Sequence, residues 1–348
     1  MKILFDNRWS APNGIGRFAV ALLEPFSARY DVGSVQTAEK PSAKLDPLRI
    51  AYEFYRGRFD LYFSPGFNGS FPIGRRQVFI LHDLTHTDRR GPIRRRILNT
   101  IYYNLLYRSA ARRAIAVVTV SQFSAGDIAR QWPDVADRLT VIPGGVAAEF
   151  KPKPVESARA GLVLFSNSRW HKNVPRTLAA LRLSEFKGVL YVVGARSAEF
   201  EHLVSDAGLK CRVEWVIRPS DEALAQLYHQ AKALLFCSIT EGFGLPVVEA
   251  LACGCHVVAS DIPAFREVGG EGCVYVDPYA IDSITAGIGV ALSAGPIDAD
   301  AVARYGARTW ANVADDFVAL LDRIQPEVAS VGGAGQPSPA GSDQIGAT

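Results

Sequence analysis

Two glutamates separated by seven residues bracket a glycine-containing turn, and here the sequence first points to chemistry. Glu241 precedes and Glu249 follows the run Gly-Phe-Gly-Leu-Pro-Val-Val. Pro246 suits the first turn of a helix, and a glycine turn that opens a helix leaves backbone N–H groups unpaired. Such amides bind anions, and carboxylates accept hydrogen bonds from sugar hydroxyls. The pattern predicts a site for a phosphorylated, hydroxyl-rich ligand, although a strand, turn and helix are also common in purely structural settings.

Two cations follow another predicted strand in the same half of the chain. Arg169 and Lys172 come soon after the apolar run 161–166. Lysine acts on a phosphate as a point charge, whereas arginine presents a planar fork of donors. The two side chains together are suited to clamp a diphosphate.

A histidine stands at the end of a predicted strand in the first half of the chain. The strand covers residues 77–81, and His82 and Asp83 follow it directly. Ligands of open α/β sheets gather at the carboxyl ends of the strands, so His82 stands where a site is expected. A packed or surface histidine is the competing interpretation, and it is the favoured one for His86.

The chain opens with an apolar strand at residues 2–6, followed by a glycine loop and a helix to about Ser27. Gly14 and Gly16 supply two glycines but not the third of a dinucleotide fingerprint, so the loop alone is weak support for cofactor binding. Arg17 would reach from this loop toward a ligand. The alternative is an arginine on a solvated helix face.

These segments together resemble the retaining family 4 glycosyltransferases. The most specific is Glu-Gly-Phe-Gly-Leu-Pro with the second glutamate eight positions after the first. Gly-Ile-Gly-Arg, His-Asp-Leu, Thr-Val-Ser-Gln-Phe-Ser and Val-Ile-Pro-Gly-Gly-Val occur in the family's order, and the resemblance covers roughly residues 2–325. It implies an α/β protein with the GT-B fold, in which two Rossmann-like domains with parallel sheets face each other across a cleft.

The resemblance also implies a role for each candidate. Glu241 would contact the hydroxyls of the donor sugar, and Glu249 would bind the ribose. Lys172 and Arg169 would stabilise charge on the departing nucleoside diphosphate, as electrostatic preorganisation requires; Arg169 departs from the family spacing in a shortened loop. His82 would lie near sugar and acceptor. The implied donor-binding residues are Gly14, Gly16, Arg17, Val216, Gly242, Phe243, Gly244, Leu245 and Glu249.

The resemblance implies no permanently bound cofactor and no essential metal. Val216 and the two residues after it would hold the nucleotide base through backbone groups. No Asp-x-Asp pair follows a predicted strand. With no second carboxylate evident at the reacting face, attack from the side of the leaving phosphate is expected rather than the two-carboxylate route of retaining glycosidases.

Composition and charge narrow the function classes. The 348 residues suffice for two domains, and 48% hydrophobic against 21% charged residues is ordinary for a soluble protein. No apolar run approaches the roughly 18–20 residues of a membrane span, and no secretion signal is recognised. Five cysteines without paired metal-ligand spacing favour a reducing compartment. We therefore expect a cytoplasmic protein.

Positive charge is concentrated in the first half. Residues 1–150 hold 21 Lys and Arg against 13 Asp and Glu, a net of +8, so the rest of the +3 chain carries −5. Arginines between 89 and 113 lie along a predicted amphipathic helix. They predict a surface for anionic lipid or a diphosphate-lipid acceptor, peripheral to the membrane, with a solvated helix face as the alternative. Nucleic acid is disfavoured because no binding module accompanies them.

We expect four segments along the chain. An acceptor-side domain covers 1–157, and a nucleotide-sugar-binding domain covers 158–306. A helix at 307–325 crosses back to the first domain. A disordered tail at 326–348 follows, because its Gly, Ser, Pro and Ala cannot bury enough apolar surface.

The sequence is most similar to bacterial mannosyltransferases of polysaccharide or O-antigen assembly, which implies transfer of mannose from GDP-mannose to a lipid-linked or oligosaccharide acceptor. Three alternatives remain: a UDP-sugar-dependent enzyme of the same fold, a non-catalytic sugar-nucleotide-binding subunit, and a GT-B-like epimerase. Activity without an acceptor would reveal the epimerase.

Overall fold

The computed structural model describes residues 1–9, 14–37, 41, 43, 45–84, 106–153 and 159–333. The expected domain boundary at 157/158 therefore lies outside the described residues, as do His86 and most of the arginines between 89 and 113.

The first domain is built on a parallel sheet of six strands in the order β2-β1-β3-β4-β5-β6. Five of these match apolar runs that the sequence predicts as strands, at residues 2–6, 60–63, 77–81, 114–120 and 139–142. The strands are β1 (Lys2–Phe5), β2 (Asp31–Ser34), β3 (Leu61–Ser64), β4 (Gln77–Ile80), β5 (Ala116–Thr119) and β6 (Leu139–Val141). The sequence Asp-Val-Gly-Ser of β2 carries little apolar signal, so the pattern missed this edge strand.

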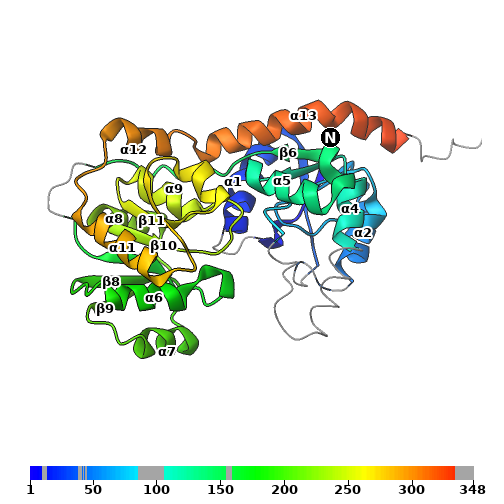
Figure 1. Cartoon of the computed structure of the whole chain (residues 1–348). Coiled ribbons are helices and arrows are strands. Elements are labelled where there is room, and N and C mark those ends of the chain that lie inside the picture. The colour runs from blue at the N-terminus through cyan, green and yellow to red at the C-terminus, as the bar shows by residue number, and fades with distance from the viewer. Residues whose placement is uncertain are drawn as a thin grey trace, which may run out of the picture.

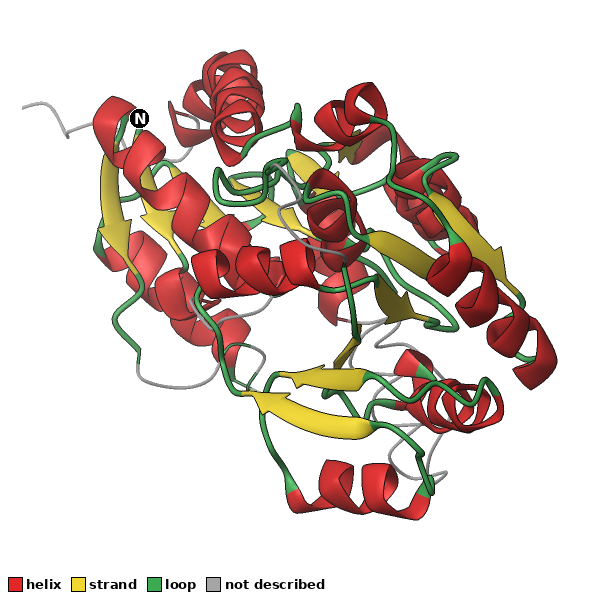
Figure 2. Cartoon of the chain, turned by 90° about the vertical axis from the view of Figure 1, so that its left-hand side faces the viewer, coloured by secondary structure: helices red, strands yellow, loops and turns green. Residues whose placement is uncertain are grey.

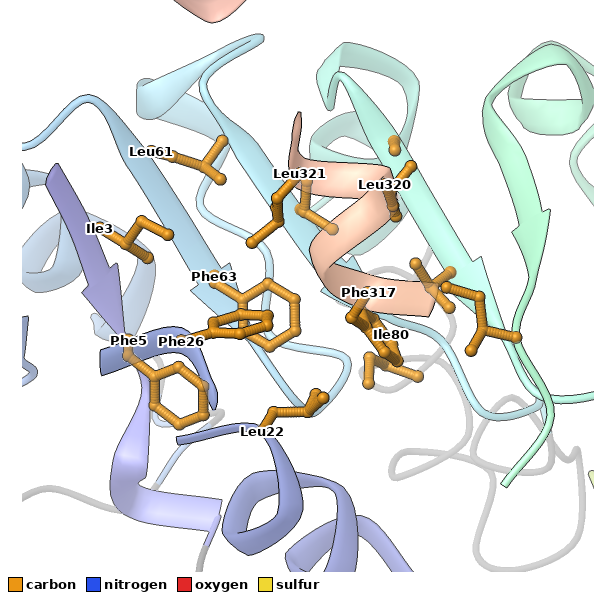
Figure 3. Packing of buried hydrophobic residues seen from close by; sticks show 14 of the residues in the cluster. Ile3, Phe5, Leu22, Phe26, Leu61, Phe63, Ile80, Phe317, Leu320 and Leu321 are labelled. Atoms are coloured by element: carbon orange, nitrogen blue, oxygen red, sulfur yellow. The ribbon is translucent and has the colours of Figure 1, made fainter. Parts of the chain in front are cut away.

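Helices cover both faces of this sheet (Figure 2). Alternate strand residues point to opposite faces, so Phe5 belongs to one core and Leu4 to the other. The first core lies under α1 (Gly14–Arg29) and α13 (Trp310–Gly333), and Figure 3 shows Phe26 and Phe317 meeting Phe63 within it. The other face carries α2 (Asp46–Arg56), α4 (Arg108–Arg113) and α5 (Gln122–Gln131).

The second domain repeats this plan with strands in the order β12-β11-β10-β7-β8-β9, all parallel. Its strands are β7 (Leu162–Phe165), β8 (Val189–Val193), β9 (Arg212–Val216), β10 (Ala233–Phe236), β11 (His256–Ser260) and β12 (Cys273–Val276). Its helices are α6 (Val174–Leu183), α7 (Ala198–Asp206), α8 (Asp221–Gln230), α9 (Leu245–Ala252), α10 (Pro263–Gly269), α11 (Ile281–Ser293) and α12 (Ala299–Gly306). Two parallel sheets with helices on both sides, joined in one chain, form the expected GT-B fold (Figure 1).

The long last helix corrects one expectation from the sequence. α13 does not end before Pro326 but contains it and continues to Gly333. Proline in a helix removes one backbone hydrogen bond. Val328, beyond the proline, is buried in the core of the first domain, and Glu327 forms an ion pair with Arg75. These contacts offset the cost of the proline, so a tail beginning at residue 326 was wrong.

Candidate active site

Glu241 and Lys172 form a direct ion pair at the carboxyl ends of two neighbouring strands. Glu241 follows β10, and Lys172 ends a short 3₁₀ turn, Trp170–Lys172, after β7. β7 and β10 pair in the sheet, so the loops after them meet. The Lys172 Nζ lies 2.5 Å from Glu241 Oε1, and both side chains are mostly buried. The lysine also sits 5.3 Å from the centre of the Phe236 ring, which limits its access to water.

Asn173 explains why Lys172 is held in place. This residue adopts the left-handed conformation with φ of 56° and is buried. Its side-chain amide donates to the carbonyl oxygens of Cys237 and Pro278 at 3.0 and 2.7 Å. The turn that carries Lys172 is therefore tied to the loops after β10 and β12.

Arg169 begins the same turn but is not brought onto Glu241. Its side chain is exposed, and its guanidinium forms no ion pair with a described residue. Between it and Lys172 lies His171, whose pKa is lowered, first by burial. The nearby Lys172 charge acts in the same direction, while Glu241 opposes it. A neutral His171 adds no further positive charge beside the lysine.

The glycine turn before α9 requires glycine at Gly244. Its φ is +104°, and a Cβ there would stand 2.8 Å from the Phe265 ring. Side chains rarely adopt such a backbone conformation, so the turn depends on glycine. α9 starts at Leu245 with no side-chain cap on its first amides. Pro246 has no N–H, and the Val247 amide donates to the Gly244 carbonyl oxygen at 2.9 Å, so the Leu245 amide is the one left for an anion among these three residues.

Gly242 lies against the first domain, and here too a side chain would not fit. A Cβ at this position would come within 2.5 Å of the His82 carbonyl oxygen and 3.2 Å of Asp83 Cβ. The loop after β4 and the loop after β10 are thus in contact across the two domains. Phe243, next along, packs against the hydrophobic cores of both.

Two serines at the start of α5 hold the carbonyl oxygen of Gly242. Ser121 Oγ donates to it at 2.6 Å and Ser124 Oγ at 3.1 Å, and both serines are buried. Ser121 also accepts from the Ser124 amide as the cap of α5, the role expected from its position. The contact with Gly242 was not foreseen, because no sequence pattern pairs residues 121 positions apart.

Glu267 of the second domain also contacts the start of α5 in the first domain. Its carboxylate accepts hydrogen bonds from the amides of Gln122 and Phe123 at 2.7 and 3.0 Å. A carboxylate is favoured at a helix N-terminus because it satisfies free amides and meets the positive end of the helix dipole.

Arg17 reaches from the first domain to two carboxylates of the second. Its guanidinium donates to both oxygens of Asp221, at 2.6 and 3.2 Å, and lies 3.3 Å from Glu249 Oε1. It also stacks near the Phe150 ring, 5.6 Å from its centre. The sequence singled out Arg17 and Glu249 separately. Asp221 is the first residue of α8, and no sequence pattern indicates its part in this contact, which depends on the closed arrangement of the domains.

Glu249 is a buried carboxylate with few polar groups around it to balance its charge. Its residue is 2% exposed, and the contact with Arg17 is the sole polar contact of its carboxylate among the described residues. Burial raises its pKa to about 7, Arg17 lowers it, and the neighbouring Asp221 raises it. A buried carboxylate whose pKa is raised toward neutral, at a contact between two domains, is a typical feature of functional sites.

His82 already uses one ring nitrogen. Its Nε2 donates to the Pro65 carbonyl at 2.9 Å, since a carbonyl oxygen can only accept. The ring edge also meets Phe18, with centres 5.2 Å apart. His82 therefore contacts the Gly242 loop through its backbone, and its Nε2 cannot act as a base in this arrangement.

The glycine loop meets the start of α9, whereas the predicted base site lies further away in the sheet. A Cβ on Gly14 would lie 3.6 Å from Leu245 Cδ1, and Gly16 is buried in the first turn of α1.

Val216 ends β9, the edge strand, and its carbonyl accepts from the Gly194 amide at 3.0 Å. Because the Val216 carbonyl already accepts this hydrogen bond, the backbone groups left to bind a base are those of the exposed residues that follow it.

Part of the predicted basic surface is described. Arg108 and Arg112 both face Asp134, at 2.9 and 3.7 Å, so this acid offsets some of their charge. Within the described ranges, no group of three His, Cys, Asp or Glu side chains could hold a metal ion. None of the described helices is long and apolar enough to cross a membrane.

Comparisons with known proteins show what this chain is similar to. Residues 148–309 match the family described as glycosyl transferases group 1. The O-antigen chain mannosyltransferase RfbU of Salmonella typhimurium is 29% identical over 215 residues, 60% of this chain and 58% of that protein. The MMP alpha-(1->4)-mannosyltransferase of Mycolicibacterium hassiacum is 30% identical over 239 residues, 65% of this chain and 58% of that protein. The chain thus spans little more than half the length of these relatives.

Solved structures share the fold over nearly the whole chain. A sucrose-phosphate synthase from Thermosynechococcus elongatus has a TM-score of 0.72 at 18% identity, covering 94% of this chain and 100% of that one. Anabaena HepE in complex with UDP has a TM-score of 0.69 at 19% identity, covering 93% and 100%. Residues 148–309 of this chain are thus similar to the group 1 glycosyl transferases.

Proposed function

We propose that this protein is a retaining glycosyltransferase that moves mannose from GDP-mannose to a lipid-linked or oligosaccharide acceptor of bacterial surface polysaccharide synthesis. The observation that carries the proposal is the Lys172–Glu241 pair beside the uncapped start of α9. A cation, a carboxylate and free amides at one edge of a sheet suit a sugar bound to a diphosphate.

The reaction would use these groups as follows. Lys172 leaves Glu241 to meet the diphosphate, and with the amides of Gly242 to Gly244 and Leu245 it stabilises the charge that develops on the leaving group. Glu241 is then free to accept hydrogen bonds from the sugar hydroxyls. Arg169 is exposed on the same turn and would move in to join the phosphate. Glu249 would accept from the ribose hydroxyls, and Arg17 would turn toward the donor.

The bond changes balance without a covalent enzyme intermediate. The bond from the anomeric carbon to the phosphate oxygen breaks, and the acceptor oxygen bonds to the same face of that carbon. The acceptor proton passes to the departing phosphate oxygen. No protein carboxylate is consumed, which fits a site whose Glu241 is already paired with Lys172.

Mannose is favoured as the transferred sugar by the names of the relatives. Beyond the two above, a Xanthomonas campestris protein that is 28% identical over 184 residues is a GDP-mannose:cellobiosyl-diphosphopolyprenol alpha-mannosyltransferase. A diphosphate-lipid acceptor for this chain rests on the same likeness. The cysteines are free thiols, as suits a reducing, cytoplasmic compartment.

Asp221 offers a reason for guanine rather than uracil. It lies five residues after Val216, next to the loop proposed to hold the base, and shares Arg17 with the proposed ribose ligand Glu249. A carboxylate can accept from both N1–H and the exocyclic amine of guanine. Uracil presents a single N–H between two carbonyl oxygens, which a carboxylate would repel.

The test compares nucleotides first and transfer second. Thermal unfolding with GDP, UDP, GDP-mannose and UDP-glucose should show the largest stabilisation by the guanine nucleotides, and Asp221→Asn should reduce that preference. In a second assay, the protein should transfer mannose from GDP-mannose to an oligosaccharide linked to polyprenyl diphosphate. A preference for UDP would favour the UDP-sugar enzyme. Binding without transfer or hydrolysis would favour a non-catalytic subunit, and conversion of the donor without an acceptor an epimerase.

A further inference from the structure

The outer face of α2 exposes a row of large apolar side chains. Toward the protein, this helix buries Ile50, Ala51 and Phe54. Toward solvent, it and the residue before it expose four large side chains at spacings of three, four and three residues, which places them on one face of a helix. These are Leu45 (54% exposed), Leu48 (52%), Tyr52 (64%) and Tyr55 (51%).

Such clustering is unusual on this molecule. The other large apolar side chains that the described residues expose are distributed over several elements: Val20, Trp170, Leu183, Ile217, Tyr279, Val290 and Val331. Single exposed apolar residues need no explanation, whereas a contiguous row marks a binding surface.

Arginines surround this row. Arg56 lies beside Tyr52, with its guanidinium 5.9 Å from the ring centre, and Arg76 lies 5.4 Å from the Tyr55 ring. Arg58 is exposed just beyond the helix end. None of these three forms an ion pair with a described residue, so their charges remain available.

The acids of α2 are bonded to other parts of the domain and not to these arginines. The Glu53 carboxylate accepts from the amides of Gln36 and Thr37 at 2.8 and 3.0 Å. Asp46 is buried and bound to Arg8. The face is therefore apolar, aromatic and cationic at once, which we call the α2 face: Leu45, Leu48, Tyr52, Tyr55, Arg56, Arg58 and Arg76.

We propose that the α2 face docks this protein on an anionic phospholipid surface. Leucines would enter the boundary between headgroups and acyl chains, tyrosines would sit at headgroup level, and arginines would pair with lipid phosphates. A second copy of the chain is disfavoured as the occupant, because two faces with the same uncompensated arginines repel each other. The inference does not depend on which nucleotide-sugar is used.

The position of the α2 face suits such a role. Figure 1 places α2 on the side of the first domain that is away from the second domain. A membrane bound there would leave the second domain free to open and close on the contacts around Gly242 and Arg17. The sequence located membrane binding in residues 89–113; the α2 face is a separate surface built from described residues.

Sedimentation with vesicles tests the proposal. We expect the whole chain to bind vesicles of phosphatidylcholine with phosphatidylglycerol, and to bind pure phosphatidylcholine far less. Leu48→Ser combined with Tyr52→Ser should weaken binding about tenfold because apolar insertion is lost. Arg56→Gln combined with Arg58→Gln should also weaken it and flatten its decline with salt, since exposed charges are screened within about 8–10 Å at physiological ionic strength. Leu183→Ser and Arg212→Gln, exposed in the second domain, are the matched controls and should bind like the wild type.

Three results would overturn the inference. One is equal binding by the α2 variants and the controls. Another is equal binding to neutral and anionic vesicles. The third is a dimer in sedimentation velocity that the Leu48→Ser/Tyr52→Ser variant dissolves, because the α2 face would then bind a second copy. Thermal stabilisation by GDP, measured without vesicles, should be the same in all variants, so failure of the docking surface and failure of the proposed function are told apart.

Discussion

Two arginine clusters differ in how fully they satisfy the hydrogen bonding of buried carboxylates. In the first domain, Arg8 donates to both oxygens of Asp6, at 2.7 and 2.6 Å, and to Asp46 at 2.6 Å. The Asn68 amide and the Tyr62 hydroxyl add hydrogen bonds to Asp6 at 2.8 and 3.0 Å. In the cleft, Glu249 is equally buried but has one ion pair of 3.3 Å.

The pKa values reflect this difference. Burial works against the charge of Arg8, but its hydrogen bonds with Asp6 and Asp46 prevail and raise its pKa above the usual value. At Glu249, burial outweighs Arg17 and raises the pKa to about 7. A fully bonded network fixes a structure, whereas an under-bonded carboxylate in a cleft can gain stability from a ligand that donates hydrogen bonds. This contrast indicates a structural role for the first cluster and is the reason for the binding role proposed for Glu249.

Removing each arginine should give the largest contrast in stability. Arg8→Met leaves Asp6 and Asp46 buried without their main partner, and breaking such a network typically costs about 3–5 kcal/mol. Arg17→Met removes a partly exposed ion pair with Asp221, and Glu249 can take up a proton because its pKa is about 7, so the loss should be less than about 1 kcal/mol. Urea unfolding followed by circular dichroism measures both. Equal losses in the two variants would mean that the clusters do not differ in kind.

The Lys172–Glu241 pair should behave as a binding group, so its loss should affect turnover more than stability. Lys172→Ala removes a cation proposed to meet the leaving diphosphate, and groups of this kind contribute about 2–4 kcal/mol to the transition state. We expect kcat to fall by roughly 30- to 1000-fold, with little change in the urea midpoint. Lys210→Ala breaks an exposed pair with Glu185 in the same domain and is the matched control. Near wild-type turnover in Lys172→Ala would remove the lysine from the mechanism.

Glu249 should lower stability at high pH. Its pKa is about 7 in the folded chain against an ordinary value of 4.5, so the folded state holds a proton that the unfolded state loses. Its favourable contribution is complete below pH 4.5 and is lost as the pH rises through 7. Glu249→Gln should therefore stabilise the protein by roughly 2–3 kcal/mol at pH 8, and by almost nothing at pH 4.

Thermal unfolding of wild type and Glu249→Gln from pH 4 to 9 measures this effect. The same variant should lose affinity for GDP, because the proposed ribose contact is gone. A gain in stability that does not change with pH would show that the pKa of Glu249 is not raised in the folded chain.

Most of the fold could be predicted from the sequence because it depends on local patterns. Fully buried parallel strands appear as short apolar runs, and the runs 77–81 and 161–166 predicted β4 and β7 for this reason. β2 was missed because an edge strand needs few apolar residues. The end of α13 was misjudged because Pro326 signals a stop locally, while the burial of Val328 depends on tertiary packing.

The candidate site could be predicted only where one segment carries the signal. Glu241, Gly244 and Glu249 belong to a single motif, and Lys172 follows a strand end. Contacts between the domains have no such signature. Asp221, Ser124 and Glu267 are ordinary polar residues at helix starts, and the closed arrangement of two separate sheets gives them partners. The sequence could not supply that arrangement.

The smallest effect concerns how the first domain holds the Gly242 loop. A carbonyl oxygen has two lone pairs, and Ser121 and Ser124 together satisfy those of Gly242. Ser124→Ala removes one donor and leaves the other, so it should cost only about 0.5–1 kcal/mol in stability. Ser121→Ala should cost somewhat more because the cap of α5 is lost as well. Both should raise the KM for the donor a few-fold and leave kcat nearly unchanged, since the loop is positioned by these serines and the donor need not touch them.

The double variant separates positioning from mere packing. With both hydroxyls gone, the buried Gly242 carbonyl loses every side-chain donor, so the loss should exceed the sum of the single changes, as expected for groups that share a partner. Ser124→Thr keeps the hydroxyl and should restore the KM if the added methyl group fits. Additive losses together with an unchanged KM would show that the serines only stabilise α5. The carbonyl of Gly242 would then resemble the saturated cluster around Arg8, and the binding loop would be held by the glycine turn and Phe243 alone.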